Sequence, residues 1–135
     1  MVAEAIEPGI TLIEEQEVTP ERAASHLGSG SLQVYATPAM LAFIEGTCRK
    51  LIEPRLPAGQ TTVGVQVHLR HLAPTPVGGR VRARAEVIEV EGGTIQFRVE
   101  VDDETERVGE AVHTRAVIDV ERFLRRVQAK AERQS

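Results

Sequence analysis

The sequence predicts an α+β domain in which a curved antiparallel β-sheet wraps around one long helix. Three observations predict this fold class. One internal stretch carries apolar residues at helical spacing. Four strand-like runs follow that stretch and can pair as antiparallel neighbours. The 135 residues, 41% of them hydrophobic, are enough for one compact core but too few for two ordinary domains. We therefore expect residues 1–135 to form a single domain.

The N-terminal part is expected to supply one strand and a loop. The stretch "GITLIEEQEVT" has strand character, and Pro20 interrupts it. The stretch "SHLGSGS" that follows is rich in Gly and Ser and is typical of a loop.

The long helix is predicted within "TPAMLAFIEGTCRKLIEPRLPAG". Thr37 followed by Pro38 is a helix-start signal, with Thr37 expected as the N-cap and Pro38 at the first helical position. Pro54 and Pro57 mark its end. The apolar stripe of this helix comprises Leu41, Ile44, Cys48, Leu51 and Ile52.

Four further strands are expected at residues 61–72, 80–90, 94–102 and 107–118. The turn "EVEGGTI" between the second and third of them favours a hairpin, because glycine tolerates the positive φ of a tight turn. The C-terminal "ERFLRRVQAKAERQS" (within 119–135) fits a solvated, partly amphipathic helix better than a phosphate-binding segment.

This order of elements is that of the hot-dog fold. A single helix cannot cover the whole concave face of the sheet as well as the sheet edges. We therefore expect pairing through an edge strand to complete the burial, in a homodimer or a dimer of dimers.

Charge and composition exclude several classes of protein. The net charge is −4 and basic residues alternate with acidic ones, which argues against nucleic-acid or anionic-membrane partners. The acidic start "MVAEAIEPGITLIEE" lacks the features of a signal peptide, and no apolar run has transmembrane length. The single cysteine excludes an internal disulfide, so a cytoplasmic location is expected. Cys48 itself fits a small buried hydrophobe better than a nucleophile.

Three polar residues stand out against their apolar surroundings. In "VGVQVHLRH" a row of alternating aliphatic residues ends in His71. On the helix, Glu45 lies about 40° from Leu41 and so falls on the apolar face, where a carboxylate needs a partner or a task. Thr37 begins the same helix on the same side, next to the positive end of the helix dipole. A hydroxyl, a carboxylate and an imidazole are the groups that activate water or a nucleophile at an acyl carbon.

Other candidate sites are weaker. His68 and His71 are three residues apart on a strand and so face opposite sides, which argues against a metal pair. His113 and Arg115 share a face of the last strand, and we expect them at the surface. The sequence implies no metal and no bound redox cofactor.

The segments "VYATPAMLAFIEGT", "TTVGVQVHLRHLAPTPVG" and "VHTRAVIDVERF" resemble hot-dog thioesterases of the fluoroacetyl-CoA thioesterase type. On that resemblance Thr37, Glu45 and His71 match the catalytic triad. Gly64 matches a glycine whose backbone helps to hold the thioester, and Arg115 matches an arginine near the CoA moiety. Strict alternation puts Gly64 opposite His71, so its role requires the backbone or a β-bulge.

The resemblance extends from about residue 34 to residue 123 and implies hydrolysis of an acyl-CoA. The fluoroacetate-selective member of the family has a phenylalanine-bearing lid ahead of the threonine, whereas this chain reads "SHLGSGSLQ" there. A more general acyl-CoA substrate is implied. His71 is expected to act as general base or acid, Glu45 to orient and stabilise it or to activate water, and Thr37 to act as nucleophile or to position water. Covalent and direct-water routes both remain open.

Two alternative functions remain. One is a hot-dog module that binds acyl-CoA without turning it over. The other is a hot-dog hydratase or dehydratase, but the helix lacks the closely spaced Asp and His that such enzymes carry.

Overall fold

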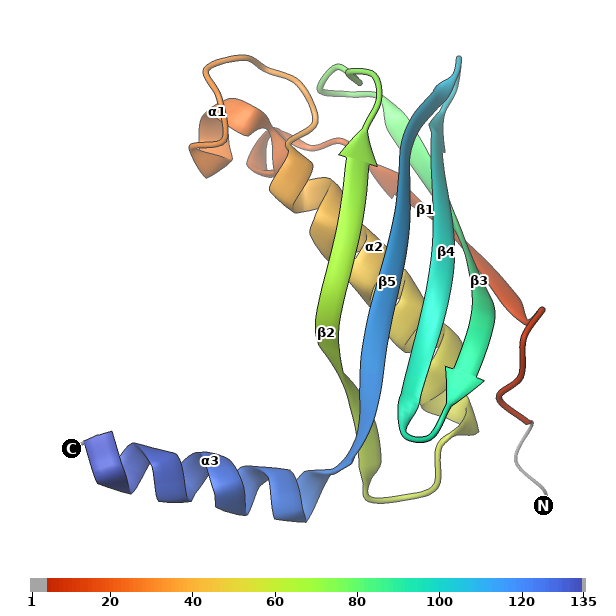
Figure 1. Ribbon diagram of the computed structural model, residues 1–135. Helices are drawn as coiled ribbons and strands as arrows, with labels where there is room; N and C mark the ends of the chain where they lie inside the picture. The colour runs from red at the N-terminus through yellow and green to blue at the C-terminus, as the bar shows by residue number, and fades with distance from the viewer. Residues whose placement is uncertain (1–4, 135) are drawn as a thin grey trace.

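The computed structural model describes residues 5–134 (Figure 1). Residues 1–4 and Ser135 lie outside the described residues. They belong to the acidic N-terminal stretch and to the C-terminal helix predicted from the sequence. The elements are β1 (Thr11–Glu17), η1 (Pro20–Arg22), α1 (Ala24–Leu27), α2 (Thr37–Ile52), η2 (Glu53–Arg55), β2 (Gln60–His71), β3 (Arg80–Glu91), β4 (Thr94–Asp103), β5 (Arg107–Asp119) and α3 (Val120–Gln134).

The strands form one antiparallel sheet in the order β1-β3-β4-β5-β2. The sheet curves around α2, which lies along one of its faces (Figure 1). This is the expected hot-dog architecture, and each strand predicted after the helix begins and ends within a residue of its prediction. β1 and β2 are the two edges of the sheet.

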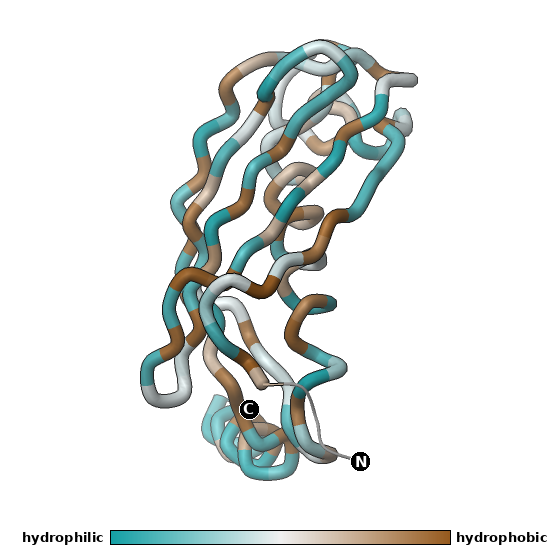
Figure 2. Tube along the Cα trace, turned by 90° about the vertical axis from the view of Figure 1, so that its right-hand side faces the viewer, coloured by the Kyte–Doolittle hydropathy of each residue, from teal (hydrophilic) through white to brown (hydrophobic). Residues whose placement is uncertain are grey.

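The core lies between α2 and the concave face of the sheet. Met40, Ile44 and Ile52 of α2 are fully buried in one cluster with alternate residues of β3 and β4. Figure 2 shows the matching alternation of hydrophobic and hydrophilic positions along the strands. Each such large aliphatic side chain contributes about 1.5–3 kcal/mol of transfer free energy. The strand residues of this core are Val81, Ala83, Ala85, Val87, Ile95, Phe97, Val99 and Val101.

The start of α2 corrects one expectation. Ala36, not Thr37, is the N-cap, and no side chain within residues 5–134 caps the helix. Thr37 is the first helical residue and Pro38 the second, where a missing N–H is still tolerated. The hydroxyl of Thr37 is therefore free for another partner.

A β-bulge in β2 decides which side chains face the helix. Gly64 pairs with Arg115 of β5, whereas Gln66 pairs with the preceding Thr114, so Val65 is an extra residue. The alternation changes phase at this point. As a result Gly64 and His71 both lie on the face toward α2, which is the β-bulge alternative of the sequence prediction.

Candidate active site

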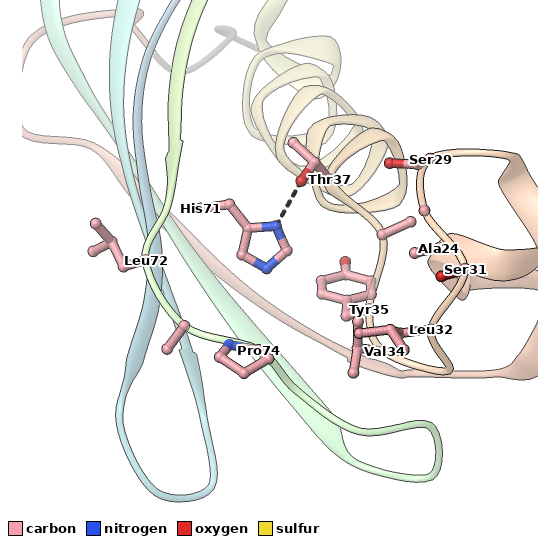
Figure 3. Close-up of a pocket in the computed structure, with 13 residues that line it drawn as sticks. Ala24, Ser29, Ser31, Leu32, Val34, Tyr35, Thr37, His71, Leu72 and Pro74 are labelled. Atoms are coloured by element: carbon pink, nitrogen blue, oxygen red, sulfur yellow. Dashed lines mark hydrogen bonds between the residues drawn. The ribbon is translucent and has the colours of Figure 1, made fainter.

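Thr37 and His71 come together where the start of α2 meets the end of β2. Thr37 Oγ1 and His71 Nδ1 are 2.8 Å apart, a hydrogen bond between the two side chains (Figure 3). The sequence separates these residues by 34 positions. The fold brings them together because β2 runs back along α2, toward the end at which the helix began. The structure thus joins two of the three expected catalytic residues.

The surroundings of His71 favour a neutral imidazole. Burial lowers the pKa of His71 below its ordinary value of 6.5. Tyr35 packs against the ring edge-to-face, with 6.4 Å between the two ring centroids. A hydrogen bond of 2.7 Å from the Tyr35 hydroxyl to Gln16 Oε1 fixes the tyrosine in turn. A neutral ring can accept a proton from the Thr37 hydroxyl through Nδ1.

A cavity of about 500 Å³ opens beside this pair. Figure 3 shows the loop after α1 on one side of the cavity and the residues after β2 on the other. The volume lies within the range of small-molecule sites in proteins. The lining residues from the loop are small or polar near its tip, and none of them is a phenylalanine: Ser29, Gly30, Ser31, Leu32 and Val34.

A second polar group lies further along the same helix. Glu45 Oε2 is 3.7 Å from Arg115 Nη1, and its side chain is 42% exposed. A Cβ built on Gly64 would lie 2.5 Å from that same carboxylate oxygen. Glu45 therefore has the charged partner that its position on the apolar face required.

Arg115 and His113 are buried, which corrects the expectation that they lie at the surface. Arg115 is only 6% exposed, and it donates hydrogen bonds to Thr62 Oγ1 and to the Thr62 carbonyl, at 2.8 and 3.0 Å. His113 accepts a third bond, of 3.2 Å, from Arg115 Nη1 at its Nε2. Its Nδ1 donates to the Gln66 carbonyl at 2.8 Å, which fixes the neutral tautomer.

The burial of this pair was not readable from the strand pattern. In "AVHTRAVI" the row of Val112, Thr114 and Ala116 is the more apolar one, so alternation points that row inward. The structure instead turns His113 and Arg115 inward, where β2 supplies oxygen atoms for both.

The two polar groups are separate within one chain. Eight residues along a helix correspond to about 12 Å, so Glu45 lies about 12 Å along α2 from Thr37. The structure therefore joins Thr37 with His71, and Glu45 with Gly64 and Arg115, but it does not join the two groups within a single chain.

His68 and Cys48 lie where the sequence predicted them. His68 is exposed and His71 faces α2, as the argument against a metal pair required. Cys48 is fully buried, and burial raises its pKa to about 12, as expected for a small hydrophobe.

Within residues 5–134, no three His, Cys, Asp or Glu side chains cluster so as to hold a metal ion. No helix in that part of the chain is long and apolar enough to cross a membrane.

Comparison with known proteins identifies the family. The chain is 33% identical over 119 residues to the fluoroacetyl-CoA thioesterase of Streptantibioticus cattleyicolor, covering 84% of this chain and 86% of that one. A solved structure of the fluoroacetyl-CoA thioesterase FlK superimposes with a TM-score of 0.88 at 29% identity, over 94% of this chain and 98% of the other. A thioesterase superfamily member from Thermus thermophilus superimposes with a TM-score of 0.85 at 32% identity, over 95% and 97%. Residues 18–121 match the model of the fluoroacetyl-CoA-specific thioesterase family, and the chain belongs to this family of thioester hydrolases.

Proposed function

We propose that this protein hydrolyses an acyl-CoA thioester to the free acid and CoA, and that Thr37 and His71 carry out the chemistry. The observation that carries this proposal is the 2.8 Å hydrogen bond between the two side chains at the rim of the 500 Å³ cavity. In the reaction the C–S bond of the thioester breaks and a C–O bond from water forms. The thiolate of CoA leaves and takes up a proton.

The geometry supports a defined role for each group. Neutral His71 accepts a proton through Nδ1, either from Thr37 acting as nucleophile or from a water that Thr37 positions. The positive end of the α2 dipole and its first N–H groups lie beside Thr37, where they stabilise the negative charge that forms on the carbonyl oxygen of the thioester when the acyl carbon is attacked. This chemistry needs no metal or redox cofactor.

Glu45 completes the site in this proposal, but from a second copy of the chain. Two described edges could pair with such a copy. Edge strand β1 carries Glu14, Glu15 and Glu17, and charged side chains on an edge strand discourage pairing with another strand. Glu14 and Glu15 are already engaged in ion pairs within the chain, with Lys50 and with Arg80 and Arg82. Residues 60–67 of β2 carry no charge, and Val65 is exposed there. The edge that fits a homodimer is therefore β2.

A two-fold axis near the middle of β2 brings the two polar groups together. Thr37 lies beside His71, and Glu45 lies beside Gly64 on the same strand. A two-fold axis halfway between His71 and Gly64 places each of these residues of one copy opposite the other residue of the second copy, and the neighbouring positions on α2 follow. In an antiparallel pair that sets His71 opposite Gly64 of the second copy, the glutamate of that copy approaches the Thr37–His71 pair. Thr37, Leu41 and Glu45 are spaced four residues apart along the side of α2 that faces β2, and all three are partly or fully exposed.

The shape of the cavity supports acyl groups larger than fluoroacetyl. Its loop wall contains serines and a glycine, and the cavity is open between that loop and Pro74. The acyl group would extend into this space from the thioester carbon beside Thr37. A cytoplasmic location, supported by the single buried thiol, suits an enzyme acting on CoA esters.

The first experiment measures release of free CoA thiol from a panel of acyl-CoAs, from acetyl to long-chain and aryl. Wild type is compared with His71→Ala and Thr37→Ala, and with His68→Ala as a control on the exposed face of the same strand. We expect kcat to fall about 10²-fold or more in the two site variants and to be unchanged in the control. Binding of the whole panel without turnover by the wild type would instead favour the module that binds acyl-CoA.

Mixing two inactive variants tests the shared site. His71→Ala and Glu45→Gln homodimers each lack one component of every site. In the mixed dimer one of the two sites is intact if Glu45 acts across the interface, so an equal mixture should recover about a quarter of wild-type activity after subunit exchange. If each chain holds its own complete site, every site carries one lesion and the mixture stays inactive.

A further inference from the structure

The C-terminal helix α3 has an apolar stripe that a single chain covers only in part, at Val120 and Phe123. Val120, Phe123, Leu124 and Val127 recur at the i, i+3, i+4 and i+7 spacing of one helix face. None of the described residues of α3 is buried, and Leu124 and Val127 are 57% and 48% exposed. An isolated helix of this length is only marginally stable in water. The stripe therefore requires a covering surface.

The direction of α3 indicates where that surface lies. The helix begins where β5 ends and runs beneath β2 and outward beyond that free edge, away from the rest of the sheet (Figure 1). This is the side on which the proposed second copy pairs with β2. Because that copy is antiparallel, the end of its sheet that carries His71 would lie above α3.

The length of α3 fits this position. Fifteen helical residues extend about 22 Å, and neighbouring strands are about 4.8 Å apart. The helix therefore spans about four strand ends. At the His71 end, the second copy would present the residue after β2, Leu72, which is 42% exposed. Its β4–β5 turn lies at the same end of the sheet.

The charges of the two surfaces are opposite. Within Val120–Gln134 there are five basic residues and two acidic ones. Residues 102–107, which form the β4–β5 turn and its flanks, contain four acidic residues and one basic one. Glu104 and Glu106 of this turn are exposed, and Arg126, Lys130 and Arg133 border the apolar stripe along a shallow groove on α3.

From the exposed stripe, the direction and length of the helix and the opposite charges, we propose that α3 is a dimerisation arm. It crosses the strand ends of a second copy, with its apolar stripe against the region of Leu72 and its basic side toward the acidic β4–β5 turn. In a two-fold dimer each copy gives one arm and receives one, so the contact is made twice. This inference rests on the homodimer of the proposed function.

Sedimentation velocity over a range of protein concentrations tests the arm. The variants are Leu124→Glu, a chain ending at Asp119, and Ala129→Glu as the matched control. The control adds the same charge to the same helix, but on the face opposite the stripe. We expect the dimer dissociation constant to rise about tenfold or more for the first two and to stay near the wild-type value for the control. Since the described residues of α3 are not buried, circular dichroism should show the sheet domain folded in all of them.

The outcomes separate the arm from the dimer. A wild-type dimer whose dissociation constant is unchanged by both Leu124→Glu and the truncation would overturn the arm while leaving the shared active site in place. A wild type that stays monomeric at every concentration would overturn the arm together with the proposed dimer. An equal effect of Ala129→Glu and Leu124→Glu would also overturn it, because the stripe would then have no special role.

Discussion

Gly64 on β2 lies against Glu45 on α2 so closely that no side chain fits between them. A Cβ on Gly64 would lie 2.5 Å from Glu45 Oε2 and 3.5 Å from Arg115 Nη1. The glycine thus sets how near the carboxylate comes to the strand. Gly64 does not have a positive φ angle, so glycine is needed here for space and not for its backbone conformation.

Replacing Gly64 by alanine should reduce activity far more than stability. The atom that must move is the end of a half-exposed side chain, so we expect the free energy of unfolding to fall by less than about 1 kcal/mol. The displaced carboxylate should lower kcat about 10- to 100-fold. Steady-state kinetics and thermal unfolding of Gly64→Ala measure the two effects.

Gly46→Ala is the matched control for this prediction. Gly46 follows Glu45 on the same helix, and a Cβ there would meet no atom within 4 Å. Alanine should stabilise the helix by about 0.5–1 kcal/mol and leave kcat unchanged. Wild-type kcat in Gly64→Ala would show that the close approach has no part in catalysis.

The sequence left the bulge that creates this contact as one of two alternatives and could not choose between them. The helix, the five strands and the candidates Thr37, Glu45 and His71 follow from local patterns, but a bulge depends on how β2 and β5 pair. The burial of Arg115 was missed for a similar reason, because its partners on β2 are more than fifty residues away in the sequence. The start of α2 was misjudged by one residue, since both Ala36 and Thr37 are compatible with the following proline.

The pH dependence of activity should have an acid limb set by His71. Burial lowers the pKa of this histidine below 6.5, so the neutral form required of a general base persists at mildly acidic pH. We expect kcat/KM to fall only as the pH drops through a value below 6.5. A profile of kcat/KM from pH 4.5 to 8 checks this, and an acid limb centred above 6.5 would contradict a buried base.

Stability should fall over the same acidic range. Burial also lowers the pKa of His113, so below pH 6.5 the unfolded chain binds protons that the folded chain does not. The free energy of unfolding therefore decreases as the pH falls from 6.5, and these groups contribute no pH dependence well above it. Denaturant unfolding at several pH values measures this, and the free energy of unfolding should change less steeply with pH for His113→Asn than for wild type.

Two substitutions of His113 should separate its two hydrogen bonds. Asparagine places an amide where Nδ1 lies and can keep the bond to the Gln66 carbonyl, whereas glutamine places an acceptor where Nε2 lies and can keep the bond from Arg115. Because Arg115 faces Glu45, we expect His113→Gln to keep more of the wild-type kcat than His113→Asn. Equal kcat in the two variants, at equal thermal stability, would mean that the hydrogen bond from Arg115 to His113 has no effect on catalysis.

Narrowing the cavity should shift the choice of acyl group. Ser31 lines the loop side of the cavity, and a phenylalanine there would fill part of its volume. We expect Ser31→Phe to lower kcat/KM for long-chain and aryl acyl-CoAs by about tenfold or more while changing the value for acetyl-CoA little. Ser25→Phe, a change outside the cavity lining, is the control. A uniform loss across all acyl groups would argue against this cavity as the acyl site.

Cys48 should take no part in the reaction, although a thiol is a familiar nucleophile in other enzymes. Its side chain is fully buried in the core between α2 and the sheet, and its pKa of about 12 leaves almost no thiolate at neutral pH. Iodoacetamide should therefore modify the protein only after unfolding. Cys48→Ala should keep wild-type kcat and lose about 1 kcal/mol of stability through the small cavity it leaves. Stoichiometric alkylation of the folded protein with parallel loss of thioesterase activity would instead assign the nucleophile to Cys48 and remove that role from Thr37.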